Sequence, residues 1–270
     1  MALKDLMVHL DPGARTAARL ELAVSLARTH GARLTGIFGQ RAMAERVGVV
    51  ATWPSPEYLA AAQASEAEFN RAVAGLAGSA WRDVNRGSDG ELIRIITAAA
   101  RNCDLFLLGQ HDETVEAHVP PLLASELVAH CGRPVLVVPY AGEFPGIGLR
   151  PLIAWDNSRE SARALNDALP LMKGCAAATV VALDMPYEAA TQSLAEVARH
   201  LASHGIAAQT EVLVAEEGHV MDSVLNRLSD LDADLLVIGA HRHAAFGFGS
   251  HPSDPRAILS GMVVPALVAR

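Results

Sequence analysis

The 270-residue sequence has few cysteines, few aromatic residues and no excess of positive charge. Its three cysteines, Cys103, Cys131 and Cys175, are an odd number without C-x-x-C spacing, which predicts unpaired thiols in a reducing compartment, the cytoplasm. Aromatic residues make up 4% of the chain and the formal net charge is -8. The chain therefore lacks the stacking surfaces and clustered positive charge that bind nucleic acids, and we expect no nucleic-acid partner.

Long apolar segments and common catalytic motifs are also missing. No window of the sequence approaches the roughly 20 apolar residues of a membrane span, so no membrane association is expected. The N-terminus reaches the charged Lys4 without the apolar core of a signal peptide. The sequence has no Walker-type lysine, no G-x-G-x-x-G after a predicted first strand and no G-x-S-x-G elbow. These absences favour a protein that is not an enzyme.

An internal repeat dominates what the sequence does contain. The run Asp104–His111 (DLFLLGQH) recurs 130 residues later as Asp234–His241 (DLLVIGAH). A second echo follows each run, because Arg133–Val138 (RPVLVV) corresponds to Val264–Ala269 (VPALVA). A repeat of this length indicates two copies of one structural unit, so each site can be compared with its counterpart.

Within each copy, apolar runs alternate with helical patterns. Leu6–Asp11 is an apolar run that ends in an acid, and the helical pattern after it stops at Gly31. Because of its prolines, the segment Trp53–Pro56 cannot continue a helix or a central strand, and a second helix is expected after it. Buried strands that alternate with helices imply parallel sheets covered on both faces. We predict an α/β fold of two doubly wound domains, residues 1–141 and 149–270, each with a mostly parallel five-stranded sheet flanked by helices.

Two acids and two glycines indicate where ligands would bind. Asp11 and Asp156 end the first strand of each copy, and Gly109 and Gly239 end the fourth. In doubly wound sheets, ligands bind beyond the carboxyl ends of the strands where the strand order reverses, so each pair is expected to border one crevice. The apolar last strands need partners along their edges, which predicts a pseudo-dimer within one chain. Association of whole chains into a homo-oligomer stays open.

These features together resemble the universal stress protein family in its tandem two-domain bacterial form. The resemblance rests on the strand-end acids, the Asp-Leu-Leu-Val-Ile-Gly-Ala-His run and the Val-Pro-Ala-Leu-Val segment near the end, and it extends over both copies. It implies a stress-response regulatory or binding protein. ATP-binding members carry G-x2-G-x9-G-[S/T] after the fourth strand, where glycine amides approach the phosphates, and their strand-end acid lies near the adenosine.

The C-terminal copy keeps this motif only in part. Gly239 is retained, Arg242 replaces the second glycine, and Pro252, which has no N–H to donate, stands at the third. The resemblance implies weak or lost binding of ATP or another adenine nucleotide in this copy. The residues that it assigns to the ligand are Asp156, Gly239, His241, Arg242, Gly249, Ser250 and Ser253.

The N-terminal copy departs further from the family motif. Asp112 stands at the second glycine, Leu122 and Leu123 stand at the closing pair, and Glu113 and Glu116 would repel phosphates. We expect no nucleotide in this copy.

Two alternative functions are weighed against this interpretation. His241, His243 and His251, with Asp254 as a fourth ligand, have a spacing that would bind zinc or nickel, although a solvated polar loop explains them equally well. A nucleotide-hydrolysing α/β enzyme would need a base and a phosphate clamp that the sequence does not present. Ser158, next to a strand-end acid, is more typical of a helix N-cap than of a nucleophile.

Overall fold

The computed structural model describes residues 2–41, 46–47, 50–51, 54–84, 88–111, 118–213, 220–240, 259 and 261–270. The first part of the chain forms β1 (Asp5–Leu10), α1 (Thr16–His30), β2 (Arg33–Phe38), β3 (Arg46–Val47), β4 (Val50–Ala51), α2 (Pro56–Ala72), β5 (Ala80–Asp83), α3 (Asp89–Ala100), β6 (Leu105–Gly109), α4 (Leu123–His130) and β7 (Val135–Val138). The second part forms β8 (Pro151–Trp155), α5 (Arg159–Ala168), β9 (Ala178–Ala182), α6 (Tyr187–Ser203), β10 (Ala208–Val212), α7 (Val220–Asp230), β11 (Leu235–Gly239) and β12 (Ala266–Ala269).

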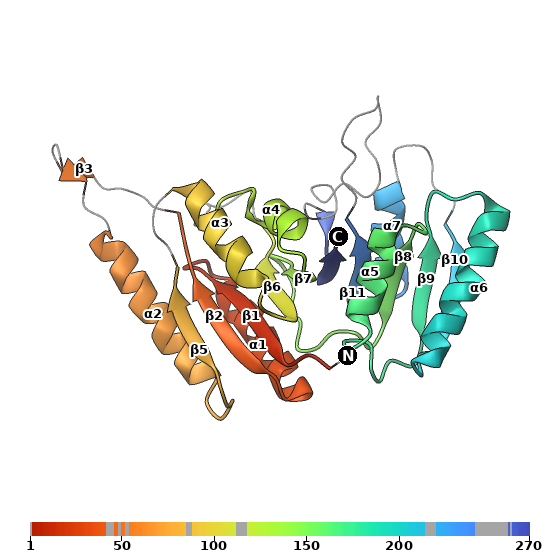
Figure 1. Cartoon of the computed structure of the whole chain (residues 1–270), viewed down its shortest axis with the longest axis horizontal. Coiled ribbons are helices and arrows are strands. Elements are labelled where there is room, and N and C mark those ends of the chain that lie inside the picture. The colour runs from red at the N-terminus through yellow and green to blue at the C-terminus, as the bar shows by residue number, and fades with distance from the viewer. Residues whose placement is uncertain are drawn as a thin grey trace.

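Ten of these strands form one continuous sheet. Their order is β10-β9-β8-β11-β12-β7-β6-β1-β2-β5, so each half of the chain supplies five strands in the same arrangement (Figure 1). Within this ten-stranded sheet, pairing is parallel inside each half and antiparallel where β7 meets β12; β3 and β4 form a separate antiparallel pair. The predicted α/β class and the pairing of the two last strands are confirmed. The domain limits at residues 141 and 149 stay a prediction.

Helices cover both faces of the sheet, as expected for a doubly wound fold. Leu105 and Leu107 of β6 face a core that also contains side chains of α1, α2, α5 and α6. Phe106 and Leu108 of the same strand face a second core, which contains side chains of α3, α4 and α7. Because successive side chains of a strand point to opposite faces, an uninterrupted apolar run is what a sheet buried on both sides requires.

The aspartate that opens each of the two repeated runs, Asp104 and Asp234, fixes the start of the neighbouring strand. Asp104 Oδ2 accepts hydrogen bonds from the backbone N–H groups of Lys4 at 2.7 Å and Asp5 at 3.0 Å, where β1 begins. Asp234 accepts from the N–H groups of Gly148 and Arg150, both at 3.0 Å, just before β8. The repeat therefore preserves a structural contact at the end of the sheet opposite to the expected ligand crevice.

Strand register aligns the two copies residue by residue. Leu105 pairs with Leu6, and its repeat Leu235 pairs with Pro151. Position n of β1 thus corresponds to position n + 145 of β8, which makes Asp11 and Asp156 equivalent. This correspondence, obtained from pairing rather than from sequence similarity, allows the surroundings of the two acids to be compared.

The structure is consistent with the sequence-based expectation that the prolines of this segment do not lie inside a helix. Pro56 is the first residue of α2, and the Ser55 hydroxyl accepts from Tyr58 N at 3.2 Å as its N-cap. A proline fits the first helical position because the N–H it lacks would have no partner in the helix.

Among the described residues, no helix is long and apolar enough to cross a membrane.

We predict that the pairing of β7 with β12 couples the two halves energetically. Leu136 and Leu267 are paired across the joint and both are fully buried. Each Leu→Ala change should cost about 2–5 kcal/mol of unfolding free energy, with a coupling of at least about 0.5 kcal/mol in the double variant. Urea unfolding measures this, and Leu136→Ala combined with Leu201→Ala in the distant α6 is the control. Additive effects in the Leu136–Leu267 pair would contradict the prediction.

Candidate functional site

The strand order reverses once in each half, and the strand-end acids lie at these points. In the N-terminal half, β2 lies on one side of β1 and β6 lies on the other side. In the C-terminal half, β9 and β11 lie on the two sides of β8 in the same way. In the N-terminal half, Asp11 directly follows β1 and Gly109 is the last residue of β6. In the C-terminal half, Asp156 directly follows β8 and Gly239 is the last residue of β11. The sequence placed these four residues correctly beside the two switch points, where α/β sheets bind ligands.

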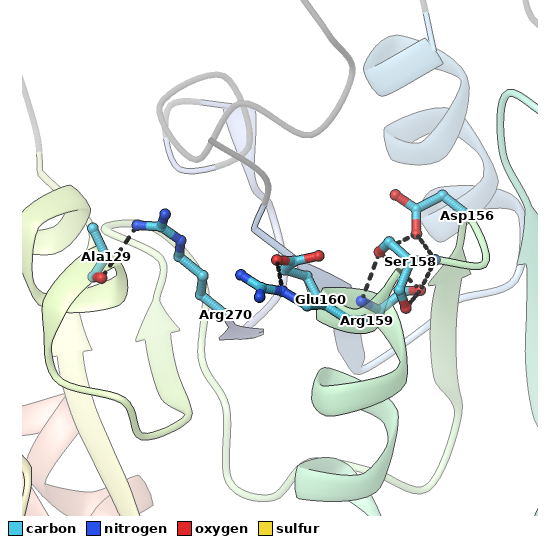
Figure 2. Close-up of polar contacts among 7 residues, drawn as sticks. Ala129, Asp156, Ser158, Arg159, Glu160 and Arg270 are labelled. Atoms are coloured by element: carbon cyan, nitrogen blue, oxygen red, sulfur yellow. Dashed lines mark hydrogen bonds and ion pairs between the residues drawn. The ribbon is translucent and has the colours of Figure 1, made fainter. Parts of the chain in front are cut away.

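In the C-terminal half, Asp156 organises the start of α5. Its Oδ1 accepts from the Ser158 backbone N–H at 3.1 Å and from the Ser158 hydroxyl at 2.6 Å (Figure 2). The Ser158 hydroxyl in turn accepts from Ser161 N at 3.0 Å, and the Ser161 hydroxyl accepts from Ser158 N, which completes a capping box. Ser158 is therefore the helix N-cap that the sequence suggested, because its oxygen satisfies an N–H of the first turn.

Gly239 is required by packing between β11 and α5. A Cβ at this position would lie 2.5 Å from the carbonyl carbon of Glu160 and would also overlap the backbone nitrogen of Ser161. These are backbone atoms at the start of the helix, so they cannot move aside as a flexible side chain would. The sequence analysis assigned Gly239 to phosphate contact. The occurrence of glycine at the same place in both copies, as Gly109 and Gly239, was the signal that could have indicated a role in packing.

Two carboxylates lie in the first turn of α5 or immediately before it. Glu160 is buried, and its Oε1 accepts from Arg159 Nε at 2.6 Å, although the Arg159 side chain is 83% exposed (Figure 2). Asp156 precedes it at the end of β8. A helix N-terminus attracts anions, and here two side-chain anions already lie beside it. A phosphate in this crevice would have to overcome their repulsion.

Several of the predicted ligand residues lie outside the described part of the chain. They are His241, Arg242, Gly249, Ser250 and Ser253, together with the candidate metal ligands His243, His251 and Asp254. Their assignment stays a prediction. Within the residues that the structure describes, no group of three or more His, Cys, Asp or Glu side chains is placed to hold a metal ion.

The N-terminal crevice contains a pocket of about 560 Å³. His9, Asp11 and Arg19 line it from the β1–α1 side, and Gly109 and Leu123 line it from the side of β6 and α4. The volume is in the range of small-molecule sites in proteins, which are mostly 300–1,000 Å³. The sequence predicted no nucleotide here and did not single out His9 or Arg19.

Arg19 is buried beneath this pocket, with 3% of its surface exposed. Its Nε donates to the His9 carbonyl at 2.8 Å, and its Nη2 donates to Asp11 Oδ2 at 2.5 Å and to Thr16 Oγ1 at 3.0 Å. The guanidinium also occupies the space that a Cβ at Gly109 would need, where Arg19 Nη1 is the nearest atom. The glycine repeated in both copies is thus packed against a side chain in one half and a helix backbone in the other.

Burial and the Asp11–Arg19 ion pair set the protonation states in this cluster. Burial lowers the pKa of His9 to about 4, so the imidazole is neutral at pH 7. Burial alone would raise the pKa of Asp11, but the positive charge of Arg19, the neighbouring His9 and the hydrogen bonds from Gly13 N and Arg19 together outweigh it and hold that pKa below its ordinary value. At neutral pH the pocket therefore contains a neutral imidazole beside a carboxylate–guanidinium pair.

The three thiols are unpaired, as predicted. Burial raises the pKa of each of them, to about 12 for Cys103. Since the thiolate is the reactive form of cysteine, none of the three is an activated nucleophile at neutral pH.

The whole arrangement matches solved structures along their full length. A universal stress protein from Archaeoglobus fulgidus superposes with a TM-score of 0.72 at 13% sequence identity, and the match covers 98% of each chain. The chain has the universal stress protein fold. A protein described as functionally unknown from Pseudomonas aeruginosa also matches, with a TM-score of 0.59 at 16% identity over 99% of this chain and 92% of that chain. No family model and no curated protein matches the sequence. The likeness to the universal stress protein fold is consequently one of architecture.

We predict that Gly239→Ala destabilises the protein through packing alone. The added methyl group meets the backbone of Glu160 and Ser161, and overpacking of this kind costs about 1–3 kcal/mol. Thermal unfolding without ligand measures the effect. Gly90→Ala is the control: nothing lies within 4 Å of a Cβ there, inside α3, so it should leave stability unchanged or raise it by up to about 1 kcal/mol. Equal melting temperatures for wild type and Gly239→Ala would show that the contact is not real.

We also predict that His9 makes the fold sensitive to acid. Its pKa is lowered in the folded state from 6.5 to about 4, so between these values the unfolded chain binds a proton that the folded chain does not. Stability is fully present above pH 6.5 and should fall by roughly 3 kcal/mol as the pH drops to 4. His9→Gln keeps a side-chain N–H donor but does not titrate, and it should flatten this slope in urea unfolding. An unchanged slope in that variant would refute the assignment.

Proposed function

We propose that this protein is a non-catalytic regulatory binding protein of the stress response, and that an adenine nucleotide such as ATP binds weakly in its C-terminal crevice. The observation that carries the proposal is the meeting of Asp156 and Gly239 at the switch point between β8 and β11. In the sequence, the segment that bears the partly retained motif begins at Gly239, the last residue of β11. The shared fold with a universal stress protein is consistent with this proposal.

Three features argue for weak binding. Asp156 Oδ1 already accepts two hydrogen bonds from Ser158, which leaves less acceptor capacity for a ribose hydroxyl. The carboxylate of Glu160 already holds the guanidinium of Arg159, which leaves that cation less able to pair with a phosphate. Pro252 removes one N–H donor of the family motif, and a charge-assisted hydrogen bond contributes about 1.5–3 kcal/mol, so its loss alone would weaken affinity roughly tenfold or more.

The chemistry of the candidate nucleophiles argues against catalysis. The Ser158 hydroxyl caps α5, and the pKa of each thiol is raised by burial. The imidazole of His9 lies in the opposite half from the proposed nucleotide crevice and contacts the Gly39 carbonyl, with 2.8 Å between Nε2 and the oxygen. These groups are committed to structural contacts, so we expect ATP to be bound without turnover.

Calorimetry with ATP, AMP and zinc separates the proposal from its two alternatives, with ATP hydrolysis assayed in parallel. The proposal expects weak heats with ATP or AMP, none with zinc, and no hydrolysis. Zinc binding that disappears in His243→Ala would establish the histidine-loop metal site instead. Hydrolysis that is lost in Asp156→Asn would establish an enzyme, because asparagine keeps the acceptor for Ser158 N while it removes the carboxylate charge.

We predict that restoring the two missing glycines strengthens nucleotide binding. Arg242→Gly combined with Pro252→Gly returns a backbone N–H and the close approach that glycine allows, so affinity for ATP should rise about tenfold or more. Asp112→Gly is the matched control, since it restores the corresponding glycine of the N-terminal copy and should leave ATP binding unchanged. No gain in the double variant, or a gain in the control, would contradict the assignment to the C-terminal crevice. Gly239 is unsuitable for this test because its substitution disturbs α5.

A further inference from the structure

The buried imidazole of His9 has a polar atom without a partner. The side chain is 0% exposed, and its Nε2 lies 2.8 Å from the Gly39 carbonyl, which only accepts hydrogen bonds. Nε2 must therefore carry the proton, and Nδ1 must be an acceptor. Within the described structure no donor reaches Nδ1. Leaving a buried acceptor unsatisfied costs about 1–3 kcal/mol, so this atom favours any molecule that brings a donor to it.

A second acceptor lies close to His9 Nδ1. Asp11 Oδ2 is 3.7 Å away, and it already accepts from Arg19. Two acceptors cannot bond to each other, but an N–H or O–H group that approaches them from the side can donate to either. The same pocket borders both residues. At His9 and Asp11 the pocket thus presents acceptors to whatever enters it.

The rest of the pocket suits a neutral, largely apolar molecule. Leu108, Val119, Pro120, Leu123 and Ala124 contribute to its wall. The buried charges of Asp11 and Arg19 compensate each other at 2.5 Å, so the pair gives no net attraction for a phosphate. Arg15, the other arginine on the lining, donates from Nη2 to the Gly142 carbonyl, and its buried Nε has no hydrogen-bond partner in the described structure.

Comparison of the two copies shows that this arrangement belongs to the N-terminal half. By strand register, Ala154 stands where His9 stands, although the strand-end acid is kept as Asp156. An imidazole is not needed for the fold at this position, since the equivalent strand is built with alanine. The acceptor atom His9 Nδ1 is therefore found in one crevice and not in the other, and the shared architecture does not require it.

We propose that the N-terminal pocket binds a small, neutral, largely apolar molecule that carries an N–H or O–H donor, which it delivers to His9 Nδ1. This site is independent of the nucleotide crevice proposed for the C-terminal half, and the ligand class is different. The acidic residues after β6, which disfavour phosphates, do not oppose a neutral ligand.

Indole and benzothiophene test the proposal as a matched pair, because they share shape and apolar surface but only indole has an N–H donor. Calorimetry on the full-length protein should show indole binding about tenfold more tightly, the factor expected for one hydrogen bond to a buried acceptor. Nitrogen-15 NMR of the histidine ring should show that indole, and not benzothiophene, shifts the Nδ1 resonance of His9. Equal binding of the two probes, no binding of indole, or an unmoved Nδ1 resonance would overturn the proposal.

The His9→Ala variant, which copies the C-terminal half, supplies a second test. It should abolish the preference for indole over benzothiophene, whereas Ala154→Ser in the other half should leave the preference intact. The ratio of the two affinities is the readout, since a general loss of structure lowers both. A preference that survives in a folded His9→Ala protein would refute the role of this residue. ATP serves as a third probe: displacement of indole by ATP would assign the pocket to nucleotides and would contradict the proposal without testing the C-terminal crevice.

Discussion

The antiparallel pairing of β7 with β12 is the constraint on which the architecture depends. Each half on its own would end in an exposed apolar strand, and such an edge is open to association with other chains. Joining the two edges buries both strands completely and turns two sheets of five into one of ten. Polar contacts cross the same joint in both directions. Arg270 donates to the Ala129 carbonyl at 3.3 Å (Figure 2), and Gln110 donates to the Leu259 carbonyl at 2.9 Å.

The two halves solve the same packing problem with different groups. In each half, the helix that follows the first strand packs against the glycine that ends the neighbouring strand, β6 or β11. In the C-terminal half the backbone of α5 fills the space over Gly239, whereas in the N-terminal half the guanidinium of Arg19 fills the space over Gly109. An arginine buried there needs a counter-ion, and the strand-end Asp11 supplies it at 2.5 Å. In the other half the equivalent acid, Asp156, accepts from the backbone N–H and the hydroxyl of Ser158, the N-cap of α5.

This exchange of partners gives the two crevices different chemistry on one scaffold. In the C-terminal half the acid accepts hydrogen bonds from Ser158 at the start of α5. In the N-terminal half the acid pairs with Arg19, and burial keeps the pKa of His9 low enough for the imidazole to stay an acceptor at pH 7. A tandem chain of this kind does not need identical ligands in its two halves. Part of the difference arises at one strand position, where Ala154 in one copy corresponds to His9 in the other.

Sequence by itself determined the architecture and the location of the crevices, since apolar periodicity, strand-end acids and a 130-residue repeat depend only on local order along the chain. It also identified Ser158 as a helix cap, because capping involves residues three positions apart. Only the tertiary structure decided what the repeated glycines and aspartates contact. Asp104 meets the start of β1, and Gly109 meets Arg19, across 90 residues or more of intervening chain. The acceptor role of His9 likewise depends on Gly39 and Asp11 converging around one buried ring. Such roles follow from which surfaces the fold brings together, and composition and spacing carry no record of that.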